Sequence, residues 1–76
     1  MEPFNIMLNS ISDVKDFVNI VNKYSIDVDL TSGRYVVDAK SIMGIFSLDL
    51  SKPIKVDIHS GDAGELYEEM KKFQID

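Results

Sequence analysis

The chain contains no cysteine, no tryptophan and only one histidine, His59, among its 76 residues. The absence of cysteine excludes disulfide bonds, thiolate zinc sites and thiol nucleophiles. A lone histidine cannot form a multi-histidine metal site, so we expect neither a metal nor another cofactor. No apolar run approaches the roughly 18 residues of a membrane-spanning helix, and the first ten residues lack the basic and apolar regions of a signal peptide. These absences predict a cytoplasmic protein with no membrane partner.

The composition is that of an ordinary globular protein, with 45% apolar and 28% charged residues. A length of 76 residues is about half that of a typical domain of roughly 150 residues, so we expect one domain over residues 1–76. Thirteen acidic and eight basic residues give a net charge of −5, which repels nucleic acids at long range. Nucleic acid is therefore not expected as a partner, although Arg34, Lys40, Lys52 and Lys55 leave a local basic surface open.

Residues 3–9 alternate between apolar and polar side chains, which predicts a first β-strand. The period then changes, and apolar residues recur at the spacing of a single helical stripe, namely Val14, Phe17, Val18 and Val21. This stripe predicts a helix over residues 11–23. Ser10 with Asp13 three residues later is typical of a capping box at the helix start, with Ser12 as the alternative cap.

Alternation resumes over residues 26–30 and again over residues 35–39, with the turn-forming residues 31–34 between them. This arrangement predicts a β-hairpin. The next apolar segment does not alternate and opens with a serine, so we expect a short helix over residues 41–48 that is capped by Ser41.

Residues 54–59 alternate once more and predict a fourth strand. A final helix follows, capped by Asp62, with an inner stripe of Ala63, Leu66, Met70 and Phe73. The element order is β-α-β-β-α-β-α. One-sided alternation in four short strands predicts an α+β fold, an open-faced two-layer α/β sandwich with a four-stranded antiparallel sheet and three helices on one face.

The segment Lys40-Ser41-Ile42-Met43-Gly44 resembles the second-helix signature of HPr, the histidine-containing phosphocarrier protein of the bacterial sugar phosphotransferase system. The resemblance extends over residues 4–74, and the turn at Ser60-Gly61 before the last helix falls at family spacing. It implies a single HPr-like domain with the same β-α-β-β-α-β-α sandwich, and hence a bacterial origin.

This chain departs from the HPr family at the phosphocarrier motif. In the family, a Gly-x-His-Ala-Arg-Pro motif carries the histidine that accepts a phosphoryl group from enzyme I and passes it to sugar transporters. The resemblance puts Ser10 at the histidine position and Ser12 at the arginine position. A serine phosphate ester is too stable for a transfer intermediate, and Asp13 and Asp16 place negative charge beside the helix amides. We therefore predict a degenerate active site without a catalytic residue, in a chain that is not an enzyme and is similar to the catabolite-repression paralogue of HPr.

Ser41 is a candidate for regulatory phosphorylation. In Gram-positive members of the family, an ATP-dependent kinase phosphorylates the serine of the corresponding segment. A phosphate at a helix N-terminus meets unpaired amides and the positive end of the helix dipole, and Lys40 adds a cation. The alternative is that Ser41 is only an N-cap, which stabilises a helix by about 1 kcal/mol relative to alanine.

The short second helix carries more apolar residues than it can bury, which favours an exposed contact surface. In the family this helix docks the kinase, a regulator and transferase components, and the resemblance gives four contact candidates, Lys40, Ile42, Met43 and Phe46. The alternative is that Ile45 and Leu48 are core residues while Met43 and Phe46 only pack on strand ends.

His59 follows Lys55 and Asp57 in the outward phase of the fourth strand, which predicts a solvated edge and argues against a role as phosphate acceptor. Three hypotheses remain: a regulatory protein-interaction module, a phosphocarrier HPr, and an unregulated structural or interaction domain. We expect a monomer, with a dimer left open.

Overall fold

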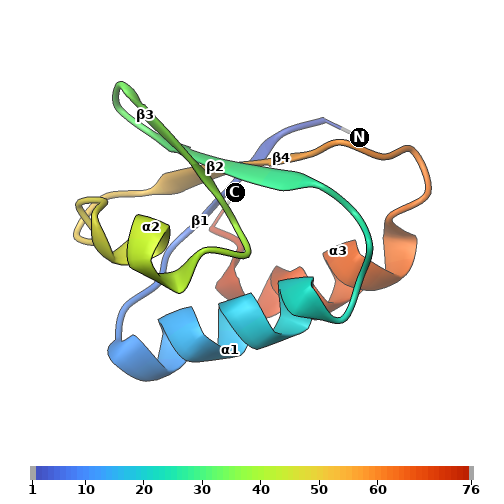
Figure 1. Ribbon diagram of the computed structural model, residues 1–76, viewed down its shortest axis with the longest axis horizontal. Helices are drawn as coiled ribbons and strands as arrows, with labels where there is room; N and C mark the ends of the chain where they lie inside the picture. The colour runs from blue at the N-terminus through green and yellow to red at the C-terminus, as the bar shows by residue number, and fades with distance from the viewer. Residues whose placement is uncertain (1, 76) are drawn as a thin grey trace.

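The computed structural model describes residues 2–75. Its elements in chain order are β1 (Phe4–Ile6), α1 (Ile11–Asn22), β2 (Val28–Ser32), β3 (Tyr35–Asp38), α2 (Ile42–Phe46), β4 (Ile54–Ile58), α3 (Gly64–Met70) and a 3₁₀ turn (Lys71–Phe73) (Figure 1). The predicted order β-α-β-β-α-β-α is confirmed.

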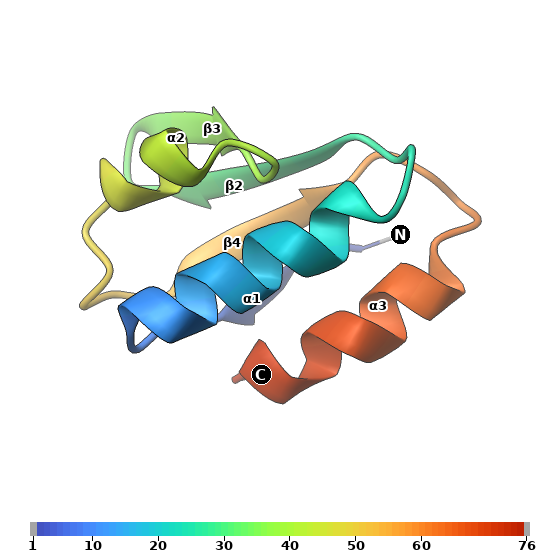
Figure 2. The same ribbon diagram turned by 60° about the horizontal axis from the view of Figure 1, so that its bottom comes forward.

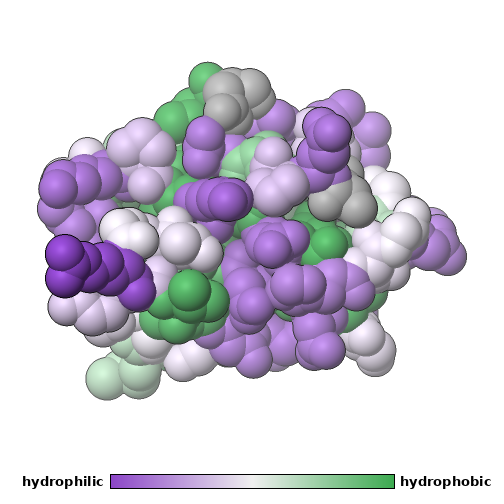
Figure 3. Space-filling model, turned by 90° about the horizontal axis from the view of Figure 1, so that it is seen from above, coloured by the Kyte–Doolittle hydropathy of each residue, from purple (hydrophilic) through white to green (hydrophobic). Residues whose placement is uncertain are grey.

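The four strands form one antiparallel sheet in the order β1-β4-β2-β3. All three helices lie on the same side of this sheet, and its other face is open (Figures 1 and 2). Seen from above, on the open side, most of the surface is hydrophilic (Figure 3). The predicted open-faced α/β sandwich is therefore confirmed.

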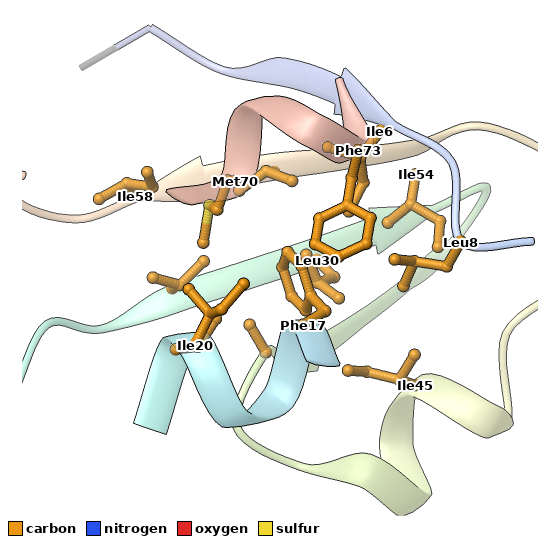
Figure 4. Close-up of a cluster of buried hydrophobic side chains, with 14 of the residues drawn as sticks. Ile6, Leu8, Phe17, Ile20, Leu30, Ile45, Ile54, Ile58, Met70 and Phe73 are labelled. Carbon is orange, nitrogen blue, oxygen red and sulfur yellow. The ribbon is translucent and has the colours of Figure 1, made fainter. Parts of the chain in front are cut away.

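The core lies between the two layers (Figure 4). Alternation gives each central strand one buried face, as in β4, where Ile54, Val56 and Ile58 are buried. From the helix side, Phe17 of α1 is fully buried and meets the ring of Phe73 edge to face, with 5.8 Å between ring centroids. The apolar helix stripes and the buried strand faces thus form a single core.

Two strands differ most from their predicted bounds: β1 is shorter, and β2 is shifted by two residues toward the turn. The first strand pairs with β4 only from Phe4 to Ile6, because Ile6 lies opposite Ile54, the first residue of β4. Leu8 is nevertheless buried, so the alternating burial continues past the last strand pair. In the hairpin, β2 begins at Val28 rather than at residue 26.

The prediction that Asp62 caps the last helix is wrong. The N-cap position of α3 is Ala63, which makes no side-chain cap hydrogen bond. Asp62 instead donates its backbone N–H to the hydroxyl of Ser60, at 3.1 Å. The helix begins at Gly64, so the carboxylate of Asp62 stands one position too early to serve as its cap.

The two edges of the sheet differ. The outer edge of β1 is covered by the end of the chain: Met7 N–H donates to the Phe73 carbonyl, and Ile75 N–H donates to the Asn5 carbonyl, both at 3.0 Å. At the other edge, no strand within residues 2–75 pairs with the outer side of β3.

Candidate functional site

Ser10 is the N-cap of α1, with extended backbone angles (φ −151°, ψ 166°). Its hydroxyl accepts a hydrogen bond from the Asp13 N–H at 3.1 Å, as the capping pattern predicts. The Asp13 carboxylate accepts the Asn9 N–H at 3.0 Å, one residue before the cap. Ser12, the alternative cap in the sequence, lies exposed inside the helix. The first turn of α1 is therefore closed by its own serine and aspartate.

A hollow of about 240 Å³ lies beside this first turn, between α1 and the end of the chain. Its charged lining residues are Asp13, Asp16 and Lys72. Two carboxylates against one ammonium give the hollow a negative balance, which disfavours a phosphate dianion.

Ser41 is the N-cap of α2, as the sequence predicts. Its hydroxyl accepts the Gly44 N–H at 3.1 Å, and its own N–H donates to the Asp38 carbonyl at 3.0 Å. The residue is exposed. A Cβ atom at Gly44 would lie 3.1 Å from the Ser41 hydroxyl oxygen and 3.3 Å from Cβ of Val37. Glycine therefore allows α2 to pack closely on β3.

The candidate contact residues on α2 differ in exposure. Met43 is 77% exposed and Phe46 39% exposed, whereas Ile42 is half-buried and packs against the core. Lys40 is half-buried just before the helix, with its N–H donating to the Asp38 carboxylate at 2.9 Å. We call Lys40, Ile42, Met43 and Phe46 the α2 surface.

Ile45 and Leu48 are buried, and Ile45 points from α2 into the core (Figure 4). In two views α2 lies beside the N-terminal half of α1 (Figures 1 and 2). Near the start of α1, Ile11 is 63% exposed, a feature that sequence reasoning missed because Ile11 extends the apolar stripe of the helix.

His59 is exposed to solvent, as predicted, but it does not lie at an edge of the sheet, so that part of the prediction is wrong. It follows β4, which is a central strand between β1 and β2. Its Nε2 atom lies 2.8 Å from the carboxylate of Asp29, and its side chain is about half exposed. This hydrogen bond, together with the nearby carboxylates of Asp57 and Asp27, raises the pKa of His59.

A second polar cluster joins the end of α1 to α3. The Glu69 carboxylate accepts hydrogen bonds from the Lys23 ammonium and the Tyr24 hydroxyl. These bonds lower the pKa of Glu69 and raise the pKa of Tyr24 to about 12. The cluster joins the end of α1 to α3, and neither Ser10 nor Ser41 belongs to it.

Within residues 2–75, no helix is long and apolar enough to cross a bilayer. In the same range, no three carboxylate or imidazole groups come together in a way that could hold a metal ion.

A comparison with known protein families gives a match over most of the chain. The family model described as the PTS HPr component phosphorylation site matches residues 13–76, far more than half of the chain. The chain belongs to the HPr family. The matched segment contains Ser41 and the whole of α2, and it begins after Ser10 and Ser12. A comparison with curated protein sequences found no match.

Solved structures of HPr proteins have the same fold. HPr-C-His from Thermoanaerobacter tengcongensis is 25% identical with a TM-score of 0.79, and the alignment covers 95% of this chain and 89% of that one. The phosphocarrier protein HPr from Bacillus anthracis is 23% identical with a TM-score of 0.75, over 97% and 96% of the two chains. A histidine-containing phosphocarrier protein from Mycoplasma is 15% identical with a TM-score of 0.75, over 93% and 89%.

Proposed function

We propose that this HPr-family chain is a regulatory protein-interaction module that does not carry phosphate on histidine and is controlled by phosphorylation of Ser41. In this proposal it is not an enzyme, requires no cofactor, and works in the bacterial cytoplasm by binding proteins through the α2 surface. The observation that carries the proposal is the pair of helix starts: Ser10, which the resemblance puts at the histidine position, closes the cap of α1, and Ser41 is the exposed N-cap of α2.

The start of α1 is poorly suited to phosphoryl transfer. A transfer intermediate needs an imidazole nucleophile that is largely neutral near pH 7 and cationic or amide donors for the phosphate oxygens. Here Ser10 uses its hydroxyl to cap the Asp13 amide, and the hollow beside it carries two carboxylates. Both features favour a closed helix cap over an acceptor site.

His59 is a poor substitute for the missing histidine because it lies at the other end of the sheet. The loop to α1 leaves β1 after Ile6, which pairs with Ile54 at the start of β4. His59 comes five residues later, about 16 Å along the strand at the usual rise per residue. It is also held by Asp29 rather than by the groups of α1.

The start of α2 is better suited to a phosphate than the start of α1. Ser41 is exposed, and its hydroxyl already lies within hydrogen-bonding distance of the Gly44 N–H. Phosphate oxygens placed there would accept hydrogen bonds from amides of the first turn, and Lys40 would supply a positive charge. Within α2 itself no acidic residue lies in the first turn, in contrast to Asp13 in α1.

The α2 surface offers a partner both apolar contact and charge. Met43 and Phe46 present exposed apolar side chains close to Ser41 on the same short helix. A phosphate on Ser41 would add about two negative charges to this surface and so change which proteins bind it. This coupling is what makes the surface a switch rather than a fixed contact.

The experiment is intact-protein mass spectrometry after incubation with ATP and an HPr kinase. We expect one phosphate on the wild type and none on Ser41→Ala. Ser47→Ala, which removes another exposed serine close to α2, is the matched control and should be modified like the wild type. A phosphate that persists in Ser41→Ala, or no phosphate on the wild type, would refute control through Ser41 and leave the unregulated interaction domain as the better account.

Docking on α2 is tested by the rate of the same kinase reaction. Met43→Asp should slow phosphorylation about tenfold, which corresponds to about 1.4 kcal/mol for an exposed apolar anchor. Ile75→Asp changes another exposed apolar side chain and should leave the rate unchanged. Equal rates for the two variants would contradict docking through Met43.

A phosphocarrier is the second candidate, favoured by the family match and by the structural similarity to phosphocarrier HPr proteins. It requires that some side chain accept phosphate from phosphoenolpyruvate through enzyme I. The chain offers only His59 as an imidazole acceptor.

A further inference from the structure

We infer that the outer edge of β3 is a self-association surface, through which two copies of this chain pair antiparallel and join their sheets into one. The edge is formed by β3 (Tyr35–Asp38) together with Arg34 of the preceding turn. The inference concerns oligomeric state and does not depend on the function of Ser41.

The first observation is that the chain covers one edge of its sheet and leaves the other open. The end of the chain covers β1, while no strand within residues 2–75 pairs with the outer side of β3, where the Asp38 carbonyl accepts the Ser41 N–H at 3.0 Å. An uncovered edge strand presents unpaired N–H and C=O groups that can template another strand. Proline and lysine are common on protected natural edges, and β3 has neither; the strand has four residues, and its charged residue, Asp38, stands at its end.

The second observation is apolar exposure on this strand. Tyr35 is 71% exposed and Val36 62% exposed, and both residue types favour β-sheets. Their side chains lie on opposite faces of the sheet, because Val36 pairs with Thr31 on the open face and Tyr35 pairs with Ser32 on the helix face. A partner strand would therefore bury apolar side chains on both faces.

The backbone geometry selects one register. Tyr35 pairs with Ser32 across the two-residue turn that contains Gly33 (φ 59°), and the Ala39 N–H donates to the Val28 carbonyl of β2. Because backbone groups along a strand alternate in direction, the N–H and C=O groups of Tyr35 and Val37 point toward β2. The N–H and C=O groups of Val36 therefore point outward. A two-fold axis through Val36 would pair Val36 with the same residue of the second copy, and Tyr35 with Val37 of that copy, in an aromatic to β-branched cross-strand pair.

Charges fit the same register. Pairing centred on Val36 brings Arg34 of each copy beside Asp38 of the other, twice over because the interface is symmetric. Within residues 2–75 neither Arg34 nor Asp38 forms an ion pair with its own chain. Asp38 also lies directly opposite Asp29, a like-charge pair that a partner's arginine would relieve.

The test is sedimentation equilibrium of the full chain from micromolar to millimolar concentration at physiological salt, where the net charge of −5 is screened. We expect the mean mass to rise from 8.6 kDa toward twice that value. Val36→Lys should remove the rise, because it places two lysines against each other across the axis. Ile11→Lys makes the same charge change on an exposed apolar residue of α1 and should still associate. A wild type that stays at 8.6 kDa throughout, or a Val36→Lys variant that associates like the wild type, overturns the inference.

Charge reversal tests the register itself. Arg34→Asp alone and Asp38→Arg alone should each lose association, and a mixture of the two should regain it, because the mixed pair restores both Arg–Asp contacts. Circular dichroism of each variant confirms that it is folded. Failure of the mixture of two folded variants to associate would overturn this register.

Discussion

The cap of α2 gives the most direct energetic prediction. Ser41→Ala removes the hydroxyl that accepts the Gly44 N–H at 3.1 Å. The helix has only five residues, and its first turn holds no acidic side chain that could replace the cap. Because the site is exposed, water solvates part of the freed amide, so we expect a loss of about 1 kcal/mol in the free energy of unfolding. For a domain of this size that corresponds to a fall of about 4–8 °C in Tm.

Two further variants separate the cap from other effects. Ser41→Asp keeps an acceptor at the same position and adds a charge that the helix dipole favours, so its free energy of unfolding should lie within about 0.5 kcal/mol of the wild type. Ser12→Ala changes an exposed serine inside α1 and should also stay within about 0.5 kcal/mol.

The assay is urea-induced unfolding followed by circular dichroism, with the slope of the transition checked for two-state behaviour. The reasoning is refuted if Ser41→Ala has the same midpoint as the wild type. It is equally refuted if Ser41→Asp loses as much stability as Ser41→Ala, because the acceptor would then be irrelevant.

Three further predictions concern the core and the two polar clusters. Phe17→Ala should cost about 3–5 kcal/mol in urea unfolding, and a loss below about 1 kcal/mol would show that Phe17 is not a core residue. Glu69→Gln should shift the phenol titration of Tyr24 from about 12 toward its ordinary value of 10 in an ultraviolet absorbance titration, whereas an unchanged titration would exclude their hydrogen bond. His59→Gln should lose stability relative to the wild type below about pH 6.5, and the difference should disappear as the pH rises through the raised pKa of His59, because only the imidazolium pairs with Asp29. A pH-independent difference in unfolding free energy would contradict that ion pair.

The parts of the fold that depend on local pattern could be predicted from the sequence. The stripe that includes Val14 and Phe17 fixes the buried face of α1, and the serines at positions 10 and 41 mark where α1 and α2 begin. These signals lie within a few residues of the elements that they specify, so no tertiary information is needed to interpret them.

The parts that depend on pairing between distant strands could not be predicted. Alternation identifies β4 as a strand but does not say which strands flank it, so the predicted edge position of His59 was wrong. The length of β1 is likewise set by the residue at which β4 begins. Tyr35 has the inward phase of its strand and is still 71% exposed, because the turn between β2 and β3 curls away from the helices (Figure 1).

The candidate site also has some features that the sequence predicts and others that depend on the tertiary structure. The residue types at Ser10, Ser41 and the α2 surface are visible in the sequence, but their exposure is not. Met43 and Phe46 differ from Ile42 in exposure only because α2 packs one side on β3, where Gly44 allows the close approach. The open edge of β3 depends on strand order, which local pattern does not encode.

The central claim is that this HPr-family chain does not carry phosphate on histidine. The most direct measurement is the intact mass of the wild type after incubation with phosphoenolpyruvate and enzyme I, with Ser10→His/Ser12→Arg as the variant in which acceptance should be partly restored. We predict no added phosphate on the wild type. An acid-labile phosphate on the wild type that is lost in His59→Gln would contradict the claim and make the protein a phosphocarrier with a relocated histidine.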